Sequence, residues 1–333
     1  MTKKKSALIL EEGPAARIYG VKELEAIRDI TDLRDGVITS RLIEGDPSVL
    51  ADVQIMFSGW GAPVLDAQFL SHAAKLEAVF YGAGSIRSMV TPAFWEKGIP
   101  ITSSWRANGI SVAEFTEALI ILSLKRFWSA SRGYSSPTVA RPPDVRGAYG
   151  AKVGLVSLGM IGRLVAERLK THDLEVLAYD PFVNQEKANA LCLGVRMVSL
   201  EELFATCEVV SLHAPNLPET RGMISTTLLA SMKFGATFVN TARGAIVDEV
   251  GLVETLQSRP DLCAVLDVTY PEPPVEGSPL YTMPNVVLTP HIAGSLGDEC
   301  YRMGQFAIEE CRRFLAGREL LWSVSQKMAE VLA

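Results

Sequence analysis

Residues 152–180 constrain the fold of this chain more than any other stretch. They begin with an apolar run at 153–156, pass through a glycine turn at 157–162, and end with a second apolar run at 176–179 and Asp180. Short apolar runs are typical of buried parallel strands, and the spacing of Ile161, Leu164, Val165 and Leu169 is typical of a helix. Strand, glycine turn, helix, strand and terminal acid together predict a dinucleotide-binding βαβ unit.

Each part of this unit has a physical role. Gly159 lets the backbone approach a pyrophosphate beside the free N–H groups of a helix N-terminus, and Gly162 allows close helix–strand packing. Asp180 can accept hydrogen bonds from a ribose 2′-hydroxyl and would repel a 2′-phosphate, which favours NAD over NADP. Ser157 replaces the usual first glycine, and we expect its Cβ to cost some turn geometry or cofactor affinity. A glycine turn in another α/β unit, with a solvated Asp180, is the alternative interpretation.

The composition narrows the class of protein. A chain of 333 residues favours two domains, and 48% hydrophobic with 21% charged residues is ordinary for a soluble globular protein. The net charge of −6 argues against nucleic acid as the main partner. Five cysteines form no CxxC pair, so we expect reduced thiols, neither a disulfide framework nor a metal site.

The sequence predicts neither a signal peptide at its start nor a membrane-spanning helix. The start, MTKKKSALILEEG, is basic but has a short apolar run before two glutamates, which favours a first strand over a signal peptide. The longest apolar helix candidate, 118–124, falls well short of a membrane span. We therefore expect a cytoplasmic protein without a membrane partner.

Predicted strands and helices alternate along the chain, which indicates parallel α/β sheets covered by helices. Outside the βαβ unit, strands are predicted at 6–10, 53–57, 76–80, 98–102, 208–212, 236–240, 263–268 and 286–288. Helices are predicted at 21–30, 65–74, 111–127, 200–204, 226–232, 249–258 and 298–316. Ser111 and Glu114 have capping-box spacing, so we expect that helix to begin there, after a polar loop at 103–109. Residues 132–150 are rich in Gly, Pro and Ser and predict an irregular connection.

Polar side chains follow three predicted strands of the nucleotide sheet. Arg243 comes after 236–240, Glu272 after 263–268, and His291 after 286–288. Ligands bind at the carboxyl edge of an open parallel sheet, so a cation, a carboxylate and an imidazole should face a bound nicotinamide. The glycine-rich loop at 81–85 also follows a strand and could hold a carboxylate, although an ordinary βα turn is an equal alternative.

At these residues the sequence resembles a known family. VAEFTEALI, SLGMIG with Asp180, SLHAPNLPETRGMI, FVNTARGAIVDE, LDVTYPEPP and LTPHIAG match the D-isomer-specific 2-hydroxyacid dehydrogenases. This family is related to D-3-phosphoglycerate, glycerate/glyoxylate (hydroxypyruvate) and formate dehydrogenases. The resemblance implies two α/β domains, Rossmann-like and flavodoxin-like, with the active-site cleft between them. Residues 1–106 and 297–333 would form the substrate domain, and 107–296 an inserted NAD-binding domain.

The resemblance also implies roles for individual residues. Arg243 would hold the substrate carboxylate, His291 would be the acid/base, and Glu272 would pair with His291. Gly82, Ala83 and Gly84 would offer backbone N–H groups to the carboxylate. The cofactor NAD would be contacted by Thr116, Ser157, Gly159, Met160, Ile161, Asp180, Pro181, His213, Pro215, Thr220, Thr241, Ala242, Asp267, His291 and Gly294.

The activity implied is reversible reduction of a 2-oxo acid to a D-2-hydroxy acid, in a homodimer formed through the nucleotide domain. A formate dehydrogenase-like enzyme is one alternative, but that branch typically pairs its histidine with glutamine. An NAD(H)-sensing, corepressor-like protein on the same fold is another. The sequence departs from the family at Arg87, Trp105 and Arg106, and these residues with Trp60 leave the substrate open. Arg87 and Arg106 are either surface charges or contacts for a second anionic group.

Overall fold

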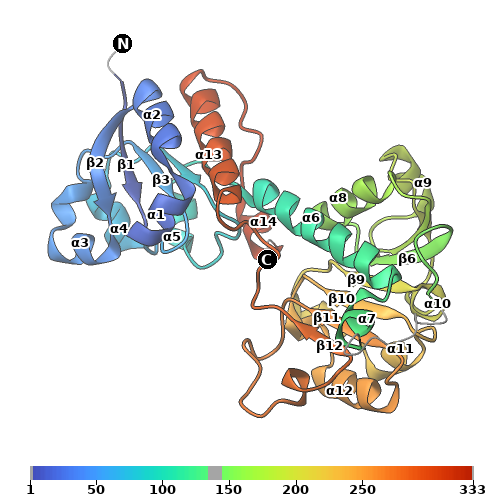
Figure 1. The fold of residues 1–333 in the computed structure, drawn as a ribbon. Coiled ribbons are helices and arrows are strands. Elements are labelled where there is room, and N and C mark those ends of the chain that lie inside the picture. The colour runs from blue at the N-terminus through green and yellow to red at the C-terminus, as the bar shows by residue number, and fades with distance from the viewer. Residues whose placement is uncertain (1–2, 134–144, 332–333) are drawn as a thin grey trace. The chain divides into compact units, whose positions relative to one another are not determined.

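The structure, a computed structural model, describes residues 3–133 and 145–331. The chain folds into two compact units (Figure 1). The first comprises residues 1–108 and 295–333, and the second residues 109–294. The expected boundaries at 106/107 and 296/297 each lie two residues away from these divisions.

The first unit contains a five-stranded parallel sheet in the order β2-β1-β3-β4-β5. The strands are β1 (Lys5–Ile9), β2 (Asp32–Ile38), β3 (Ile55–Ser58), β4 (Ala78–Tyr81) and β5 (Ile101–Ser103). This is the strand order of flavodoxin-like sheets. Strand β2 was not predicted, because this edge strand is mostly exposed and its sequence, DLRDGVI, is polar.

Helices cover both faces of this sheet. They are α1 (Glu12–Ile18), α2 (Val21–Ile30), α3 (Ser40–Gly45), α4 (Ala67–His72), α5 (Pro92–Glu96), α13 (Glu299–Leu315) and α14 (Gln326–Val331), with a 3₁₀ turn η1 (Pro47–Leu50). One core cluster joins α1, α2 and α13 to the sheet, and the other lies under α4, α5 and α14. Helix α13 packs against α1 and α2 although they come from opposite ends of the chain (Figure 1). Gly304 permits this approach, because a Cβ there would lie 2.2 Å from the carbonyl oxygen of Ile18.

The second unit contains a seven-stranded parallel sheet in the order β12-β11-β10-β9-β6-β7-β8. The strands are β6 (Ala151–Val156), β7 (Leu174–Tyr179), β8 (Arg196–Met197), β9 (Val209–Leu212), β10 (Thr237–Asn240), β11 (Cys263–Leu266) and β12 (Val286–Leu288). Read from β8, this is the doubly wound Rossmann order with one added strand, and the order reverses between β6 and β9. That switch point is where ligands bind in such sheets.

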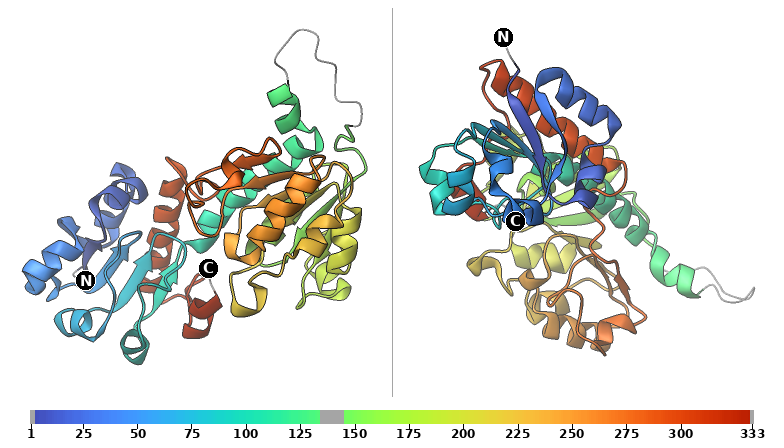
Figure 2. Two further views of the ribbon diagram at one scale, coloured as in Figure 1. Left: turned by 90° about the horizontal axis from the view of Figure 1, so that it is seen from below. Right: turned by 90° about the vertical axis from the view of Figure 1, so that its left-hand side faces the viewer.

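Helices also cover both faces of the second sheet (Figure 2). They are α6 (Trp105–Leu124, whose residues 105–108 belong to the first unit), α7 (Phe127–Gly133), α8 (Met160–Leu169), α9 (Gln185–Ala190), α10 (Leu200–Thr206), α11 (Thr226–Ala230) and α12 (Glu249–Ser258). Short 3₁₀ turns are η2 (Pro218–Thr220), η3 (Gly244–Ile246) and η4 (Pro279–Tyr281). The core under α10, α11 and α12 contains Phe204 and Phe238, whereas the opposite core packs α6 and α8 against β6.

The expected start of the helix at Ser111 is wrong. Helix α6 begins at Trp105, so most of the predicted polar loop is helical and Ser111 is buried inside the helix. The N–H of Trp105, the first helical residue, donates to the hydroxyl of Ser103 (3.3 Å). The helix ends at Leu124, because Arg126 adopts a positive φ of 49° before α7.

The predicted connection at 132–150 is also shorter than expected. Residues 132 and 133 complete α7, and 145–150 form a loop before β6. Residues 134–144 of that prediction lie outside the described residues.

Within the described ranges, α6 is long and apolar enough to span a membrane by length and composition. The prediction from 118–124 therefore underestimated this helix, which has 20 residues. In the structure, 56% of the apolar stretch of α6 is buried inside the protein, and buried core helices of soluble proteins can have the same length and apolar composition. Length alone therefore does not make α6 a membrane span.

Candidate active site

The glycine turn after β6 leads directly into α8. Gly159 is the N-cap of α8, and Met160 and Ile161 are its first two residues. A Cβ on Gly162 would lie 2.1 Å from the main-chain oxygen of Ser157, so only glycine fits here. Ser157 has a φ of 78°, a left-handed conformation that favours glycine. The turn thus keeps the geometry of an all-glycine motif even though a serine occupies its first position.

Asp180, at the end of β7, holds this turn in place. Its Oδ2 accepts hydrogen bonds from the N–H of Leu158 (2.7 Å) and the hydroxyl of Ser157 (3.2 Å). Its Oδ1 accepts from the N–H of Phe182 (2.8 Å), and Pro181 lies between them in sequence. The carboxylate has about four acceptor positions, so these bonds leave room for a further donor such as a ribose hydroxyl.

The turn after β10 is fixed by side chains from two elements. Asn240 accepts from the N–H of Ala242 (3.0 Å) and donates to the carbonyl of Arg243 (3.1 Å). The buried hydroxyls of Thr116, on α6, and Thr241 lie 3.0 Å apart. No role was predicted for Asn240, although it lies within the motif FVNTARGAIVDE.

Arg243 follows this turn and is partly buried. Its Nη1 donates to the carbonyl of Ala242 (2.6 Å). Burial lowers the pKa of the Arg243 guanidinium from its usual value, and the nearby Glu272 carboxylate acts in the opposite direction. An arginine remains charged under any such shift at neutral pH, so the site holds a partly desolvated cation suited to a carboxylate.

His291 and Glu272 form a close pair. Nδ1 of His291 lies 2.6 Å from Oε1 of Glu272, and both side chains are partly exposed, by 47% and 39%. With Nδ1 facing the carboxylate, Nε2 is the nitrogen that can exchange a proton with a ligand. His291 also has a positive φ of 53°, so its backbone must be held by its surroundings.

Asp267, buried at the end of β11, supplies that hold. Its carboxylate accepts from the hydroxyl of Thr289 (2.6 Å) and from the N–H groups of Ile292 (2.8 Å) and Ala293 (2.9 Å). Its carbonyl accepts from the N–H of His291 (3.0 Å). Asp267 therefore fixes the whole loop that carries the imidazole.

His213 ends β9 at the same edge of the sheet, next to the switch point. It is buried and its Nε2 lies 3.0 Å from the hydroxyl of Ser211. Burial lowers the pKa of His213 to about 4, so this imidazole is neutral at neutral pH. In the loop beyond it, Thr220 donates to the carbonyl of Pro215 (2.5 Å) and accepts from the N–H of Leu217 (2.9 Å).

Most of the predicted cofactor contacts thus lie in the loops that follow β6, β7, β9, β10, β11 and β12. The exceptions are Thr116 on α6, Met160 and Ile161 on α8, and Gly294, the last residue of the unit. The arrangement places a pyrophosphate turn, a ribose acceptor, a cation and a histidine–carboxylate pair along one edge of one sheet. Such an edge can bind a dinucleotide and transfer a proton beside it.

The glycine loop after β4 lies in the first unit. The N–H of Gly82 already donates to the carbonyl of Ser58 (2.8 Å), so it is not available as expected. Ala83 is fully buried, and its carbonyl accepts from the hydroxyl of Ser103 (2.9 Å). The same hydroxyl also bonds the carbonyl of Gly84.

Two of the unusual residues of the first unit pack on the C-terminal segment. The guanidinium of Arg106 lies 4.8 Å from the ring centre of Trp322, whose ring also contacts Trp105 at 6.4 Å. A cation–π contact of this kind accounts for Arg106 without a ligand. Trp60 packs against the core and Arg87 is exposed.

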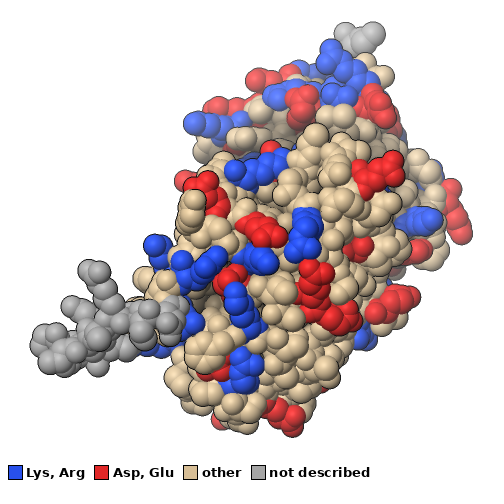
Figure 3. Space-filling model, turned by 90° about the vertical axis from the view of Figure 1, so that its right-hand side faces the viewer, with Lys and Arg blue, Asp and Glu red and all other residues tan. Residues whose placement is uncertain are grey.

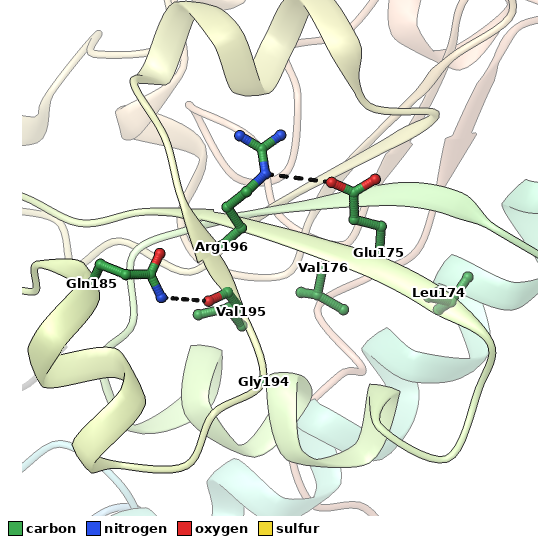
Figure 4. A pocket seen from close by; sticks show the side chains of 7 residues that line it. All are labelled: Leu174, Glu175, Val176, Gln185, Gly194, Val195 and Arg196. Atoms are coloured by element: carbon green, nitrogen blue, oxygen red, sulfur yellow. Dashed lines mark hydrogen bonds and ion pairs between the residues drawn. The ribbon is translucent and has the colours of Figure 1, made fainter.

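A hollow elsewhere on the second unit lies away from this sheet edge and contains none of the predicted site residues. A hollow of about 490 Å³ between β7 and β8 is lined by Glu175, Arg196 and Gln185 (Figure 4). Glu175 and Arg196 pair with each other at 3.4 Å, and the hollow lies at the opposite end of β7 from Asp180.

On the face shown in Figure 3, basic and acidic side chains are mixed, so that face offers no basic surface for nucleic acid.

The sheet order, the glycine turn at the switch point and Asp180 define a dinucleotide-binding α/β protein. Residues 118–293 match the family model of the D-isomer specific 2-hydroxyacid dehydrogenase, NAD binding domain. The chain belongs to this family, and NAD is its cofactor. The family predicted from the sequence is confirmed.

Individual relatives agree. D-3-phosphoglycerate dehydrogenase of Mycobacterium tuberculosis is 33% identical over 295 residues, which are 88% of this chain and 54% of that protein. The chain thus spans about half the length of the curated relatives it matches. A protein structure from Thermus thermophilus aligns with a TM-score of 0.73 at 29% identity, covering 96% of this chain and 100% of the other.

A more distant neighbour shows the shared fold. The NAD-complexed D-isomer specific 2-hydroxyacid dehydrogenase of Lactobacillus delbrueckii ssp. bulgaricus aligns with a TM-score of 0.79 at 22% identity. The alignment covers 96% of this chain and 100% of the other. The predicted fold class, two parallel-sheet α/β regions, is confirmed.

Proposed function

We propose that this chain interconverts a 2-oxo acid and a D-2-hydroxy acid with NAD(H). The observation that carries the proposal is the Glu272–His291 pair at 2.6 Å together with a partly buried Arg243, whose guanidinium lies close enough to the Glu272 carboxylate for Glu272 to raise the pKa of Arg243. An arginine beside an acid/base histidine is the donor set that a 2-oxo acid requires, because one group binds a carboxylate and the other exchanges a proton.

The residues at the sheet edge fit NAD. Gly159 and the N-terminus of α8 offer N–H groups to a pyrophosphate, Gly162 lets α8 approach the end of β6, and Asp180 offers an acceptor for the ribose. The carboxylate of Asp180 would repel a 2′-phosphate, which supports NAD over NADP. When bound, the nicotinamide supplies or accepts the hydride.

Side chains of the protein would bind the substrate and transfer the proton. Arg243 binds the substrate carboxylate and draws electron density from the neighbouring carbonyl. His291 gives its Nε2 proton to the carbonyl oxygen during reduction and takes it back during oxidation. Glu272 accepts a hydrogen bond from Nδ1 of His291 and so fixes the orientation of the imidazole that presents Nε2. The amides of Ala83 and Gly84 are further candidate donors to a carboxylate.

The first test is NADH and NADPH oxidation against a panel of 2-oxo acids, from glyoxylate and hydroxypyruvate to aromatic and phosphorylated acids. We expect turnover with NADH that His291→Ala abolishes while NADH binding persists. His72→Ala, a histidine on α4 of the first unit, is the matched control and should retain full activity. The best acid in the panel identifies the substrate class.

Other outcomes would reject the proposal. NADH binding without turnover on any acid would instead support a nucleotide-sensing protein. Oxidation of formate but no reduction of 2-oxo acids would support a formate dehydrogenase, against the presence of Glu272. Preference for NADPH would overturn the role given to Asp180.

We also propose that the protein is a cytoplasmic homodimer that associates through its nucleotide-binding unit. The support is the apolar character of α6, whose partly exposed Ile121 and Leu122 could contribute to an interface. Analytical ultracentrifugation of the full chain measures the mass directly. A single species of 36.1 kDa at micromolar concentration would contradict the dimer.

A further inference from the structure

We propose that Glu249 is a positioning residue, which holds the Glu272-bearing segment in register with His291 by binding the backbone N–H of Tyr270. The catalytic meaning of this inference rests on the proposed function. The contact itself does not, because it joins two described parts of the second unit.

The segment that carries Glu272 is poor in backbone donors. Its sequence is Thr269-Tyr-Pro-Glu-Pro-Pro, so three of the five residues from 270 to 274 are prolines without an N–H. Tyr270 and Glu272 therefore carry the segment's remaining backbone donors between 270 and 274. Such a segment cannot be held by the ladder of hydrogen bonds that fixes a strand or helix.

Burial holds Thr269, but it does not hold the residues on either side of Pro271. The Tyr270 side chain is 63% exposed, and the Glu272 side chain is 39% exposed. Thr269 donates within the segment, to the carbonyl of Pro271 (2.8 Å), which shapes it without attaching it to the rest of the unit. Beyond Glu272 the hydroxyl of Tyr281 donates to the carbonyl of Pro274 (2.9 Å), so it is the Tyr270 end of the segment that needs a further anchor.

Glu249 provides that anchor. Its Oε2 accepts from the N–H of Tyr270 at 2.9 Å, and Glu249 is the first residue of α12, whose position is set by the Asp248 cap on Gly251 (3.1 Å). Burial raises the pKa of Glu249, and the Tyr270 N–H partly offsets this, as expected for a carboxyl group withdrawn from water to make one specific contact.

A second contact, between Gly244 and Thr269, connects the residues next to Arg243 with the segment that carries Glu272. Between Arg243 and Glu249 in sequence, Gly244 lies against Thr269 so closely that a Cβ would fall 2.0 Å from the Thr269 carbonyl carbon. One stretch, 243–249, thus presents Arg243 and also clamps the backbone two residues before Glu272. Loss of the clamp should let Glu272 drift from His291, and misplacement by about 1 Å can cost about 100-fold in rate.

The test compares Glu249→Ala with Glu249→Gln, which keeps a carbonyl oxygen as acceptor. We expect Glu249→Ala to lower kcat roughly 10- to 100-fold while KM for the 2-oxo acid and NADH binding change by about twofold or less. Glu249→Gln should recover most of kcat. Glu254→Ala, an exposed glutamate on the same helix, is the matched control and should behave as wild type.

A second readout needs no turnover. The chain has four histidines, and His291→Ala assigns the His291 ring signal in the proton NMR spectrum of the full protein. Because Oε1 of Glu272 lies 2.6 Å from Nδ1 of His291, Glu249→Ala should move the His291 ring signal toward its position in Glu272→Gln. Glu249→Gln should leave it near wild type.

The outcomes separate this inference from the proposed function. A wild-type protein without turnover rejects the proposed function, yet the NMR spectrum still tests Glu249. Wild-type kcat together with an unchanged His291 ring signal in Glu249→Ala overturns the positioning role. So does an equal loss in Glu249→Ala and Glu249→Gln, because the acceptor would then not be what matters.

Discussion

The main-chain oxygen of Ser157 occupies the space beside Gly162, 2.1 Å from where a Cβ on Gly162 would stand. This contact fixes how closely α8 approaches the end of β6, and so where the helix N-terminus meets a pyrophosphate. Gly162→Ala should therefore destabilise the protein by about 1–3 kcal/mol and weaken NADH binding. Urea unfolding and NADH fluorescence titration measure the two effects. Gly13→Ala, with open space around its Cβ on α1, should not destabilise.

Ser157 adopts a conformation that suits glycine, yet its hydroxyl bonds Asp180. Ser157→Ala keeps the strained Cβ and loses the hydrogen bond, whereas Ser157→Gly loses both. Because a non-glycine residue in this region costs about 1–2 kcal/mol, Ser157→Gly should be more stable than Ser157→Ala by about 1 kcal/mol. Chemical denaturation of both variants checks this order. The reverse order would show that the φ of 78° carries no strain here.

Arg243 is expected to recognise a carboxylate through two parallel hydrogen bonds, which lysine cannot reproduce. Arg243→Lys should raise KM for the 2-oxo acid at least about tenfold and leave the NADH dissociation constant unchanged. Steady-state kinetics and NADH titration measure these quantities. Equal weakening of substrate and NADH binding would instead mean that Arg243 supports the fold of the sheet edge.

His213 should make stability depend on pH. Burial lowers the pKa of His213 to about 4, whereas a histidine in the unfolded chain titrates near about 6.5. The unfolded state therefore takes up a proton first as the pH falls. The contribution of neutral His213 to the free energy of unfolding is therefore fully present above about pH 6.5. It is lost as the pH falls toward 4, by ~3 kcal/mol. Urea unfolding across this range measures the slope, and His213→Asn should flatten it. Equal slopes for both proteins would contradict the assignment.

The cysteines should differ in reactivity by exposure. Cys192 is exposed, whereas burial raises the pKa of Cys207 and of Cys311 to about 12. Since the thiolate is the reactive form, a thiol reagent should modify the exposed Cys192 rapidly in the native protein. Cys192→Ser should remove that fast phase. Rapid labelling of Cys207 or Cys311, detected by peptide mass spectrometry, would show that the core opens readily.

How far the sequence could predict the structure depended on how local each signal is. The βαβ unit at 152–180 was predictable because apolar strands, glycines and Asp180 lie in one short stretch. Helix α12 was predicted residue for residue, since its spacing and its Asp248 cap agree. Strand β2 was not, because it pairs with β1 at an exposed edge and has no apolar pattern of its own.

The site shows the same division. Arg243, Glu272 and His291 could be proposed from the ends of their strands, but their partners could not. Glu249 binds Tyr270 across 21 residues, and Asn240 holds a turn from within a buried strand. Similarly, Ser111 has the capping pattern, yet α6 begins at Trp105, directly after β5 ends, and the N–H of Trp105 donates to Ser103. Such choices depend on tertiary position, which sequence spacing does not record.

The first unit is assembled from both ends of the chain, whereas residues 109–294 form the second without interruption. During synthesis, the dinucleotide-binding sheet can therefore close as soon as β12 has left the ribosome. The first sheet must wait longer, because α13 covers one of its faces and is made after the whole second unit. Until then Ile18, Phe57 and Phe80 lack part of their apolar cover, and partly built cores of this kind are prone to aggregation.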